Sequence, residues 1–254
     1  MCLSFVLATL TNAQTIDIPD ANFKAMLLNA SPNNSIASNE SHFTITIDTN
    51  GDGEIQVSEA LQVYSLRIME AEIADLTGIE YFTNLENLNC GYNQLTSLAG
   101  IESLPNLTSL TCQINHFTSM YVSGLSTLNE LRCNNNSIAT LTLNENLTIL
   151  DCSNNPLGVL DVSALTNLEI LRCNSISLSS LDLTGLSNLH TLFCIGNSLT
   201  SLNVSPLMNL KRLDFSGNSI TNIDLSALTS LEYLACTQNG LTSLDVTASP
   251  NLID

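Results

Sequence analysis

The sequence predicts a repeat solenoid built from short stacked coils, and three observations lead to this fold class. The phrase L-x-x-L-x-C-x-x-N-x-L-x-x-L recurs about every 21 residues. Within it, apolar residues alternate as in a β-strand with one buried side. An asparagine follows where the strand must bend, and a unit this small can bury its apolar side only by stacking on its neighbours. The phrase begins at Val63, Leu85, Leu107, Leu128, Leu147, Leu168, Leu189, Leu210, Leu231 and, shortened, at Leu252.

The register L-x-x-L-x-L-x-x-N-x-L resembles the leucine-rich repeat over about residues 63–254. This resemblance implies an α/β-type repeat solenoid, a right-handed coil with a parallel β-sheet on the concave face. Irregular or 3-10 turns are implied on the convex face. We expect nine coils and a truncated tenth, and because the tenth coil stops at Asp254 we expect a fragment of a longer protein.

Residues 1–13 form an apolar run that ends in a small-x-small pattern, Thr11-Asn12-Ala13. This pattern predicts an export signal peptide whose missing basic start a truncated gene start would explain. The run is too short to cross a membrane, and no later segment is long and apolar enough. Cys2 precedes the run, so we do not expect a lipid-anchoring cysteine. The prediction is a secreted or cell-surface protein without a transmembrane segment.

The composition limits the class of partner. The chain has 254 residues, 44% of them hydrophobic, and a formal net charge of −18. Six Lys and Arg residues cannot neutralise many phosphates, so we expect neither nucleic acid nor an anionic membrane as a partner.

Residues 14–62 lack the repeat and predict an N-terminal cap over the open end of the solenoid. Asp20 is the expected N-cap of a short amphipathic helix that continues to Leu28. The segment is similar to the N-terminal segments of secreted bacterial leucine-rich repeat proteins.

Residues 48–59 fill the pattern D-x-[DN]-x-[DN]-G-x5-E and resemble an EF-hand-type calcium loop. Gly53 permits the sharp turn. The entering segment, residues 42–47, alternates like a strand, so we expect a lone structural Ca²⁺ site followed by a short helix over residues 58–62. The alternative is an Asp- and Gly-rich turn that binds nothing. The expected ligands are Asp48, Asn50, Asp52, Glu54 through its backbone carbonyl, Gln56 and Glu59.

Seven cysteines occupy one repeat position, where Phe215 replaces the cysteine in one coil. The strand register predicts a buried column. In-register parallel strands keep Cβ atoms too far apart for a disulfide, so we expect buried thiols; a disulfide framework or a soft-metal column remains the alternative. The column comprises Cys90, Cys112, Cys133, Cys152, Cys173, Cys194 and Cys236.

Two further polar rows recur. The asparagines of the repeated phrase are expected to bond the backbone of the turns. Ala71 and Ile176 stand where this asparagine is missing, so irregular structure is expected near both. A row of aspartates, with Asn203 among them, is expected to cap turns on the convex side or, alternatively, to hold cations weakly. That row is Asp161, Asp182, Asp224 and Asp245.

The outward strand positions form two columns on the expected concave face, and they hold four of the six basic residues of the chain. Arginine with aromatic and aliphatic groups is typical of interaction hot spots. We predict a ligand-binding face centred on coils four to eight. Alternatively the arginines pair with Glu130, Asp151 and Asp214 and keep the sheet soluble. The predicted ligand-binding residues are Arg67, Arg132, Ile149, Ile170, Arg172, Phe193, Arg212 and Tyr233.

These features favour an exported, non-enzymatic module that binds a protein or glycan for adhesion or recognition. The chain resembles internalin-like and other bacterial surface leucine-rich repeat proteins, whose family role this is. The alternative is a stiff spacer that presents another domain. His42, His116 and His190 fall in unrelated repeat positions and offer no base–nucleophile pair, so we expect no enzyme.

Overall fold

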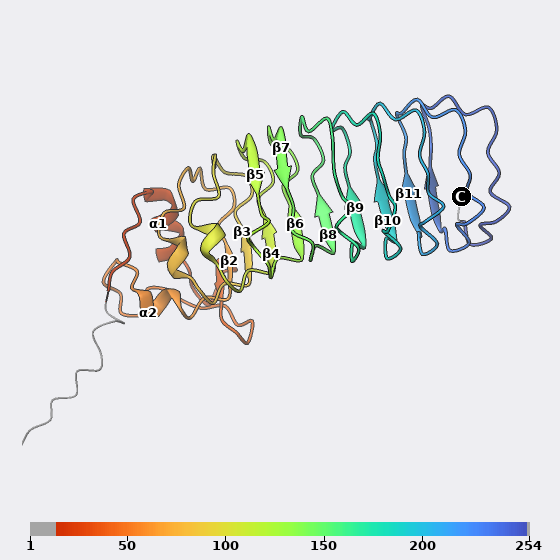
Figure 1. Cartoon of the computed structure of the whole chain (residues 1–254). Helices are drawn as coiled ribbons and strands as arrows, with labels where there is room; N and C mark the ends of the chain where they lie inside the picture. The colour runs from red at the N-terminus through yellow and green to blue at the C-terminus, as the bar shows by residue number, and fades with distance from the viewer. Residues whose placement is uncertain (1–13, 253–254) are drawn as a thin grey trace, which may run out of the picture. The chain divides into compact units, whose positions relative to one another are not determined.

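A computed structural model describes residues 14–252, which form a parallel-strand solenoid and confirm the predicted fold class (Figure 1). The export signal predicted at residues 1–13, including Cys2, lies outside the described residues. The chain divides into two compact units, one up to Leu107 and one from Thr108 onward.

The first unit begins with the predicted helix, α1 (Ala21–Leu28), which buries Phe23 and Leu27. One oxygen of Asp20 accepts from the N–H groups of Asn22 and Phe23, both at 2.9 Å. Its other oxygen accepts from the N–H groups of Ala74 and Asp75 at 2.9 and 3.1 Å. Desolvation acts to raise the pKa of Asp20, but these four bonds outweigh it and lower the pKa. Asp20 therefore caps the helix and ties it to the first coil.

The rest of the first unit leads into the repeat. The strand β1 (Ala37–Ser38) pairs antiparallel with β2 (Ser65–Arg67), and β2 pairs parallel with β3 (Asn87–Asn89). The short helix is α2 (Val57–Ala60). Residues 42–47 contain no helix, as expected, and make one antiparallel bridge between Ser38 and Thr44. The 3-10 turns η1 (Ile79–Tyr81) and η2 (Ile101–Ser103) confirm the turn type predicted after the strands.

In the second unit, seven parallel strands form the main sheet, each beginning two residues after a phrase start. Figure 1 shows β8 to β11 side by side, one strand per coil. Neighbouring strands pair in register, so equivalent residues of successive coils stack in columns. The strands are β4 (Ser109–Thr111), β6 (Glu130–Arg132), β8 (Ile149–Asp151), β9 (Ile170–Arg172), β10 (Thr191–Phe193), β11 (Arg212–Asp214) and β12 (Tyr233–Ala235).

A second, two-stranded parallel sheet was not expected from the sequence. It pairs β5 (Ser119–Tyr121) with β7 (Thr140–Thr142) on the returning side of two coils. Tyr121 and Thr142 stand where later coils carry the aspartate or asparagine of the convex row. A short Asx side chain bonds its own backbone and competes with strand pairing, whereas Tyr and Thr favour a strand. The prediction of turns alone was therefore wrong for these two coils.

Columns of apolar side chains fill the interior. The nine complete phrases all begin with a side chain that is 0% exposed, from Val63 to Leu231. Burial of a leucine contributes about 1.5–3 kcal/mol, so each coil depends on the neighbours that cover it.

The cysteine column is buried as predicted, except that Cys236, which directly follows the last strand, is only half-buried. In the second unit, Cys133, Cys152, Cys173 and Cys194 are free thiols, each 0% exposed. Burial raises the pKa of Cys133 and Cys194 to about 12. These thiols pack as small apolar groups.

The asparagine ladder bonds the turns as predicted. The side chain of Asn197 donates to the carbonyls of Cys173 and Cys194 at 2.9 and 3.0 Å. Its oxygen accepts from the N–H groups of Ile176 and Leu178 at 3.1 and 3.0 Å. One buried side chain thus satisfies backbone groups of two successive coils.

The irregularity predicted where the asparagine is missing is confirmed. In every complete coil, the second residue after the cysteine position has a positive φ. In the coils that carry Ala71 and Ile176, the fourth residue after that position has a positive φ too. These additional residues are Glu72, with φ of 56°, and Ser177, with φ of 64°. These coils lack an asparagine of their own, and the asparagine of the next coil accepts from two N–H groups of each such turn. Their backbone reverses through a second left-handed residue.

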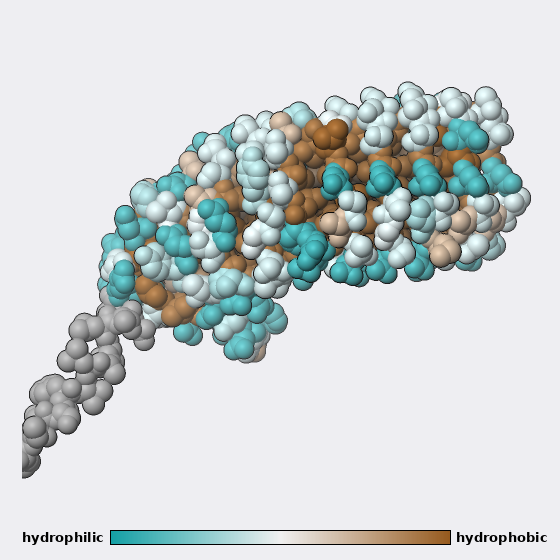
Figure 2. Space-filling view, in the orientation of Figure 1, coloured by the Kyte–Doolittle hydropathy of each residue, from teal (hydrophilic) through white to brown (hydrophobic). Residues whose placement is uncertain are grey.

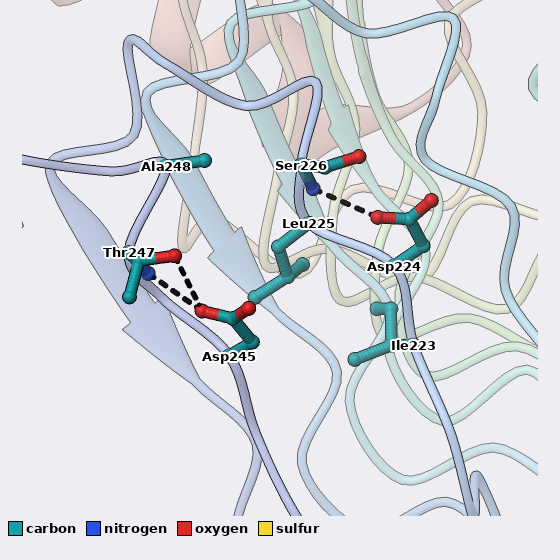
Figure 3. A pocket seen from close by; sticks show the side chains of 7 residues that line it. All are labelled: Ile223, Asp224, Leu225, Ser226, Asp245, Thr247 and Ala248. Carbon is teal, nitrogen blue, oxygen red and sulfur yellow. Dashed lines mark hydrogen bonds between the residues drawn. The ribbon is translucent and has the colours of Figure 1, made fainter.

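The convex row consists of turn caps, as expected. Figure 2 shows hydrophilic groups at even intervals along an apolar band in the part of the molecule that carries β8 to β12. The side chains of Asp161 and Asp245 each accept from the N–H and hydroxyl of the residue two places on. In Figure 3, Asp224 and Asp245 flank a hollow of about 80 Å³ between neighbouring coils, each bonded to its own turn.

One prediction concerns the left-handed turn position. Ile114 is a β-branched residue with φ of 54°, whereas Asn135, Asn154 and glycines occupy the equivalent positions of other coils. Because Asn tolerates this conformation better than Ile, Ile114→Asn should raise the free energy of unfolding by about 1 kcal/mol. Urea unfolding of both proteins measures the change. Ile114→Val is the control, since it stays β-branched and should give no gain; a loss of stability in Ile114→Asn contradicts the strain argument.

A second prediction concerns acid stability. The hydroxyl and then the N–H of the residue two places on lower the pKa of Asp161, Asp182, Asp224 and Asp245. The stabilisation from each is present above the unfolded-state pKa, about 3.9, and is lost as pH falls through the lower folded-state pKa. Between pH 5 and about 3, the double variant Asp182→Asn/Asp224→Asn should therefore lose less stability than the wild type, measured as the urea midpoint.

The natural Asn203 provides the control for this experiment, because its side chain makes the same bonds to Ser205 without titrating. The reciprocal change Asn203→Asp should steepen the dependence on pH. Equal slopes for all three proteins would contradict a role of the caps in acid stability.

Candidate ligand-binding face

The candidate site is the outward side of the main sheet in the second unit, here called the strand face. Its side chains form the two predicted columns, because the strands pair in register. The first column is Ser109, Glu130, Ile149, Ile170, Thr191, Arg212 and Tyr233; the second is Thr111, Arg132, Asp151, Arg172, Phe193, Asp214 and Ala235.

Four of the predicted binding residues come together on β9 to β12. The guanidinium carbons of Arg172 and Arg212 lie 5.8 and 5.7 Å from the ring centre of Phe193. The guanidinium carbon of Arg212 also lies 5.4 Å from the ring centre of Tyr233. The two rings are in edge contact, with centres 6.4 Å apart. These distances are in the range of cation–π contacts, and we call these four residues the Arg–aromatic cluster.

The two arginines of the cluster are not neutralised by any residue that the structure describes. In the described part of the chain, neither Arg172 nor Arg212 makes an ion pair. The buried Nη1 atom of Arg172 also has no hydrogen-bond partner there. The expected partners bond their own turns, since Asp151 accepts from the N–H of Ser153 at 3.1 Å. Asp214 likewise accepts from the following turn. The pairing of these arginines with Asp151 and Asp214 that we considered is therefore wrong.

The other predicted residues lie elsewhere on the sheet or make different contacts. Arg132 pairs with Glu130 at 2.6 Å, which is the pairing that the solubility hypothesis predicted. Ile149 and Ile170 are strand neighbours and are half-buried beside the cluster. Arg67 is an exposed residue of β2, which belongs to the first unit.

The spacing of the four residues in the sequence is a further signal for this cluster. Arg172 and Phe193 are one repeat period apart, and so are Arg212 and Tyr233. A period of 21 residues places such pairs on adjacent strands about 4.8 Å apart, within reach of a cation–π contact. The orphaned Nη1 atom depends on side-chain packing, so the sequence could not reveal it.

The predicted calcium loop lies in the first unit and closes through its own hydrogen bonds. Asp48 accepts from the N–H groups of Gly51 and Gly53 at 2.8 and 3.0 Å. The carboxylate of Glu59, only 5% exposed, accepts from the N–H and hydroxyl of Thr49 at 2.7 and 2.8 Å and from the N–H of Gln56. The bond to Gln56 starts α2 at Val57, so the predicted helix bounds 58–62 were too late.

The remaining predicted ligands surround Asp52. Its carboxylate accepts from the side-chain amides of Asn50 and Gln56 at 2.9 and 3.0 Å, and from the N–H of Glu54. That backbone bond, followed by the amides, lowers the pKa of this exposed carboxyl. The side chain of Glu54 pairs with Lys24 at 2.7 Å, which leaves its carbonyl as the predicted ligand.

In this conformation the loop does not converge as a metal site. Among residues 14–252, no group of three or more His, Cys, Asp or Glu side chains is arranged to hold a metal ion. The donor chemistry still fits Ca²⁺, because the loop offers carboxylate, amide and carbonyl oxygens. The side-chain amides of Asn50 and Gln56 donate hydrogen bonds to Asp52, and a bound cation would take the place of these donors.

The histidines do not form a catalytic arrangement in the described residues. His42 and His116 are exposed. His190 contacts the hydroxyl of Thr191 and lies 3.7 Å from Glu169. Nothing about these contacts points to a reactive nucleophile.

Comparisons with known proteins agree with this architecture. The family model for leucine-rich repeats, in two copies, matches residues 83–126 and 209–250. A comparison with curated protein sequences finds no significant match. Among solved structures, the functional domain of InlJ from Listeria monocytogenes, which includes a cysteine ladder, is similar with 31% identity and a TM-score of 0.75. The similarity covers 96% of this chain and 57% of that structure, so the chain spans little more than half of that relative.

Two further structures share the fold alone. An internalin (inlF) from Listeria monocytogenes has 23% identity and a TM-score of 0.52, over 97% of this chain and 84% of that one. TLR13 in complex with ssRNA13 has 18% identity and a TM-score of 0.58, over 83% of this chain and 37% of that one. The repeated phrase, the in-register parallel strands and these matches show together that the chain has the fold of a leucine-rich repeat solenoid.

Proposed function

We propose that this protein is a non-enzymatic binding module that recognises a protein partner through its strand face. The observation that carries this proposal is the Arg–aromatic cluster, in which two unpaired guanidinium groups and two rings are presented on one rigid sheet. Arginine and aromatic residues are enriched among the residues that dominate binding energy at interfaces. Cation–π contacts hold them in place, which reduces the entropy lost on binding.

Apolar residues next to the Arg–aromatic cluster extend the surface that a partner could contact. Ile149 and Ile170 continue the cluster on β8 and β9, and Tyr233 is 40% exposed on β12. Half-buried apolar groups beside fixed charges suit the centre of an interface, where water is excluded. The similarity to the functional domain of InlJ is consistent with a recognition role.

Export to the cell surface or the medium belongs to the same proposal. It is supported by the apolar run and small-x-small pattern of residues 1–13 and by the likeness to Listeria proteins. Within residues 14–252, none of the helices has the length and apolar composition needed to span a bilayer. The net charge of −18 favours a partner other than nucleic acid.

The experiment measures binding to an array of cell-surface proteins and glycans, with wild type and two variants. Phe193→Ala removes the ring between the two arginines and should weaken binding by about tenfold or more. Met208→Ala is the matched control, because Met208 is 63% exposed but lies outside the strands, and it should bind as wild type does.

Each result separates the alternatives. Selective binding to glycans, with no protein bound, would assign a glycan ligand to the face. Equal binding by wild type and Phe193→Ala would contradict recognition through this cluster. No selective binding at all would favour the spacer that we considered, which presents another domain and needs no specific face.

We also propose that residues 48–59 hold one structural Ca²⁺. The support is the complete match of the loop pattern and the position of the loop in the first unit. Ile55 accepts from the N–H of Ile16 at 2.8 Å, and Val57 donates to Gln14 at 2.9 Å, so the loop backbone fastens the segment that leads into α1. The oxygens of Asp48, Asp52 and Glu59, together with Asn50, Gln56 and the carbonyl of Glu54, are the proposed ligands.

Calorimetric titration of Ca²⁺ into chelator-treated protein tests this proposal. We expect saturable binding at one site and a higher melting temperature, with about 2.7 kcal/mol of stabilisation at a free Ca²⁺ concentration of 100 times Kd. Asp52→Asn should abolish the heat of binding, because it removes a ligand charge while keeping an acceptor oxygen. Glu40→Gln, an exposed change outside the loop, should not. Absence of both heat and melting shift would reduce the loop to a turn.

A further inference from the structure

The basic residues of the second unit fall into two kinds. Arg132 pairs with Glu130 at 2.6 Å, and Lys211 pairs with Glu232 at 3.3 Å. Arg172 and Arg212 make no ion pair with any described residue, although the chain has 24 acidic residues and only six basic ones. In a protein so rich in carboxylates, two unneutralised guanidinium groups on one face are a specific feature of the arrangement.

The packing of these arginines keeps their charge available. Phe193 lies between them, and the cation–π contacts at 5.8 and 5.7 Å orient the guanidinium groups without neutralising them. A guanidinium group has five N–H donors in a planar fork, which matches the two oxygens of a carboxylate. The buried Nη1 atom of Arg172 lacks an acceptor among the described residues.

The carboxylates nearest in register accept hydrogen bonds from their own turns and form no ion pair with the cluster among the described residues. Asp151 is the strand neighbour of Arg172, and Asp214 is the strand neighbour of Phe193. Both accept hydrogen bonds from the turn that follows their own strand, at 3.1 and 3.0 Å. The guanidinium groups of Arg172 and Arg212 therefore keep donors that a carboxylate from outside the chain can use.

We propose that the Arg–aromatic cluster binds an acidic peptide segment of the partner protein, with Glu or Asp carboxylates on Arg172 and Arg212. Apolar side chains of the same segment would pack on Tyr233, Ile149 and Ile170. This inference rests on the proposed function and narrows it to a class of partner. The net charge of −18 repels an acidic partner at long range, so recognition depends on short-range contacts with the two guanidinium groups.

The test uses the full chain and a short fluorescein-labelled peptide in which Glu and Tyr alternate, compared with the same peptide carrying Gln in place of Glu. Fluorescence anisotropy should show that the wild type binds the Glu peptide about tenfold more tightly than the Gln peptide. The double variant Arg172→Gln/Arg212→Gln should lose this difference. Arg132→Gln is the matched control, since it removes a charge from the same face that is already paired, and it should keep the difference.

Several outcomes would overturn the inference. They are equal affinity for the two peptides, an equal loss in Arg132→Gln, or displacement of the Glu peptide by a neutral peptide as readily as by an acidic one. Tight binding of a sulfated glycan without binding of the Glu peptide would also overturn it. Thermal melting curves of each variant verify that the solenoid is folded.

The experiments distinguish an error in the acidic-segment proposal from an error in the proposed recognition through the strand face. A partner found on the array that is lost in Phe193→Ala but retained in Arg172→Gln/Arg212→Gln would keep recognition through the strand face. The same result would reject an acidic partner segment.

Discussion

The turns of this solenoid are completed by side chains that belong to a neighbouring coil. Asn197 bonds the carbonyl of Cys173 and the N–H groups of Ile176 and Leu178, all in the coil before its own. A coil whose buried backbone groups were left unbonded would lose about 1–3 kcal/mol for each of them. Coils are therefore interdependent, and their register is held where the chain bends as well as where the strands pair.

The strand face is a consequence of that register. Because strand neighbours stack without offset, a residue recurring after one period stands beside its predecessor. Arg172 next to Phe193, and Arg212 next to Tyr233, follow from this rule alone. The same rule brings together aspartates on the returning side, where each carboxylate is bonded within its own turn.

Periodic features were predictable from the sequence, and departures from the period were not. The strand starts, the buried columns, the asparagine ladder and the Asp20 cap follow from local chemistry that repeats or has a strong signature. The β5–β7 pair arises where Tyr121 and Thr142 replace a capping residue. This replacement can be recognised only when the sequences of the coils are aligned with one another. Asp151 and Asp214 can bond either a nearby guanidinium group or the N–H of their own turn. The outcome of this competition decides whether an arginine is neutralised. Sequence spacing does not decide that competition, since both partners are within reach.

The reactivity of the buried thiols reports local unfolding of the solenoid. A thiol with a pKa of about 12, such as that of Cys133 or Cys194, is ionised in only about one molecule in 10⁵ at neutral pH. It is also covered by the adjoining coils, so alkylating and oxidising reagents reach it only when those coils separate. Chemical modification of each buried cysteine is thus governed by the local opening equilibrium of its coil, whereas the half-buried Cys236 is partly accessible without opening.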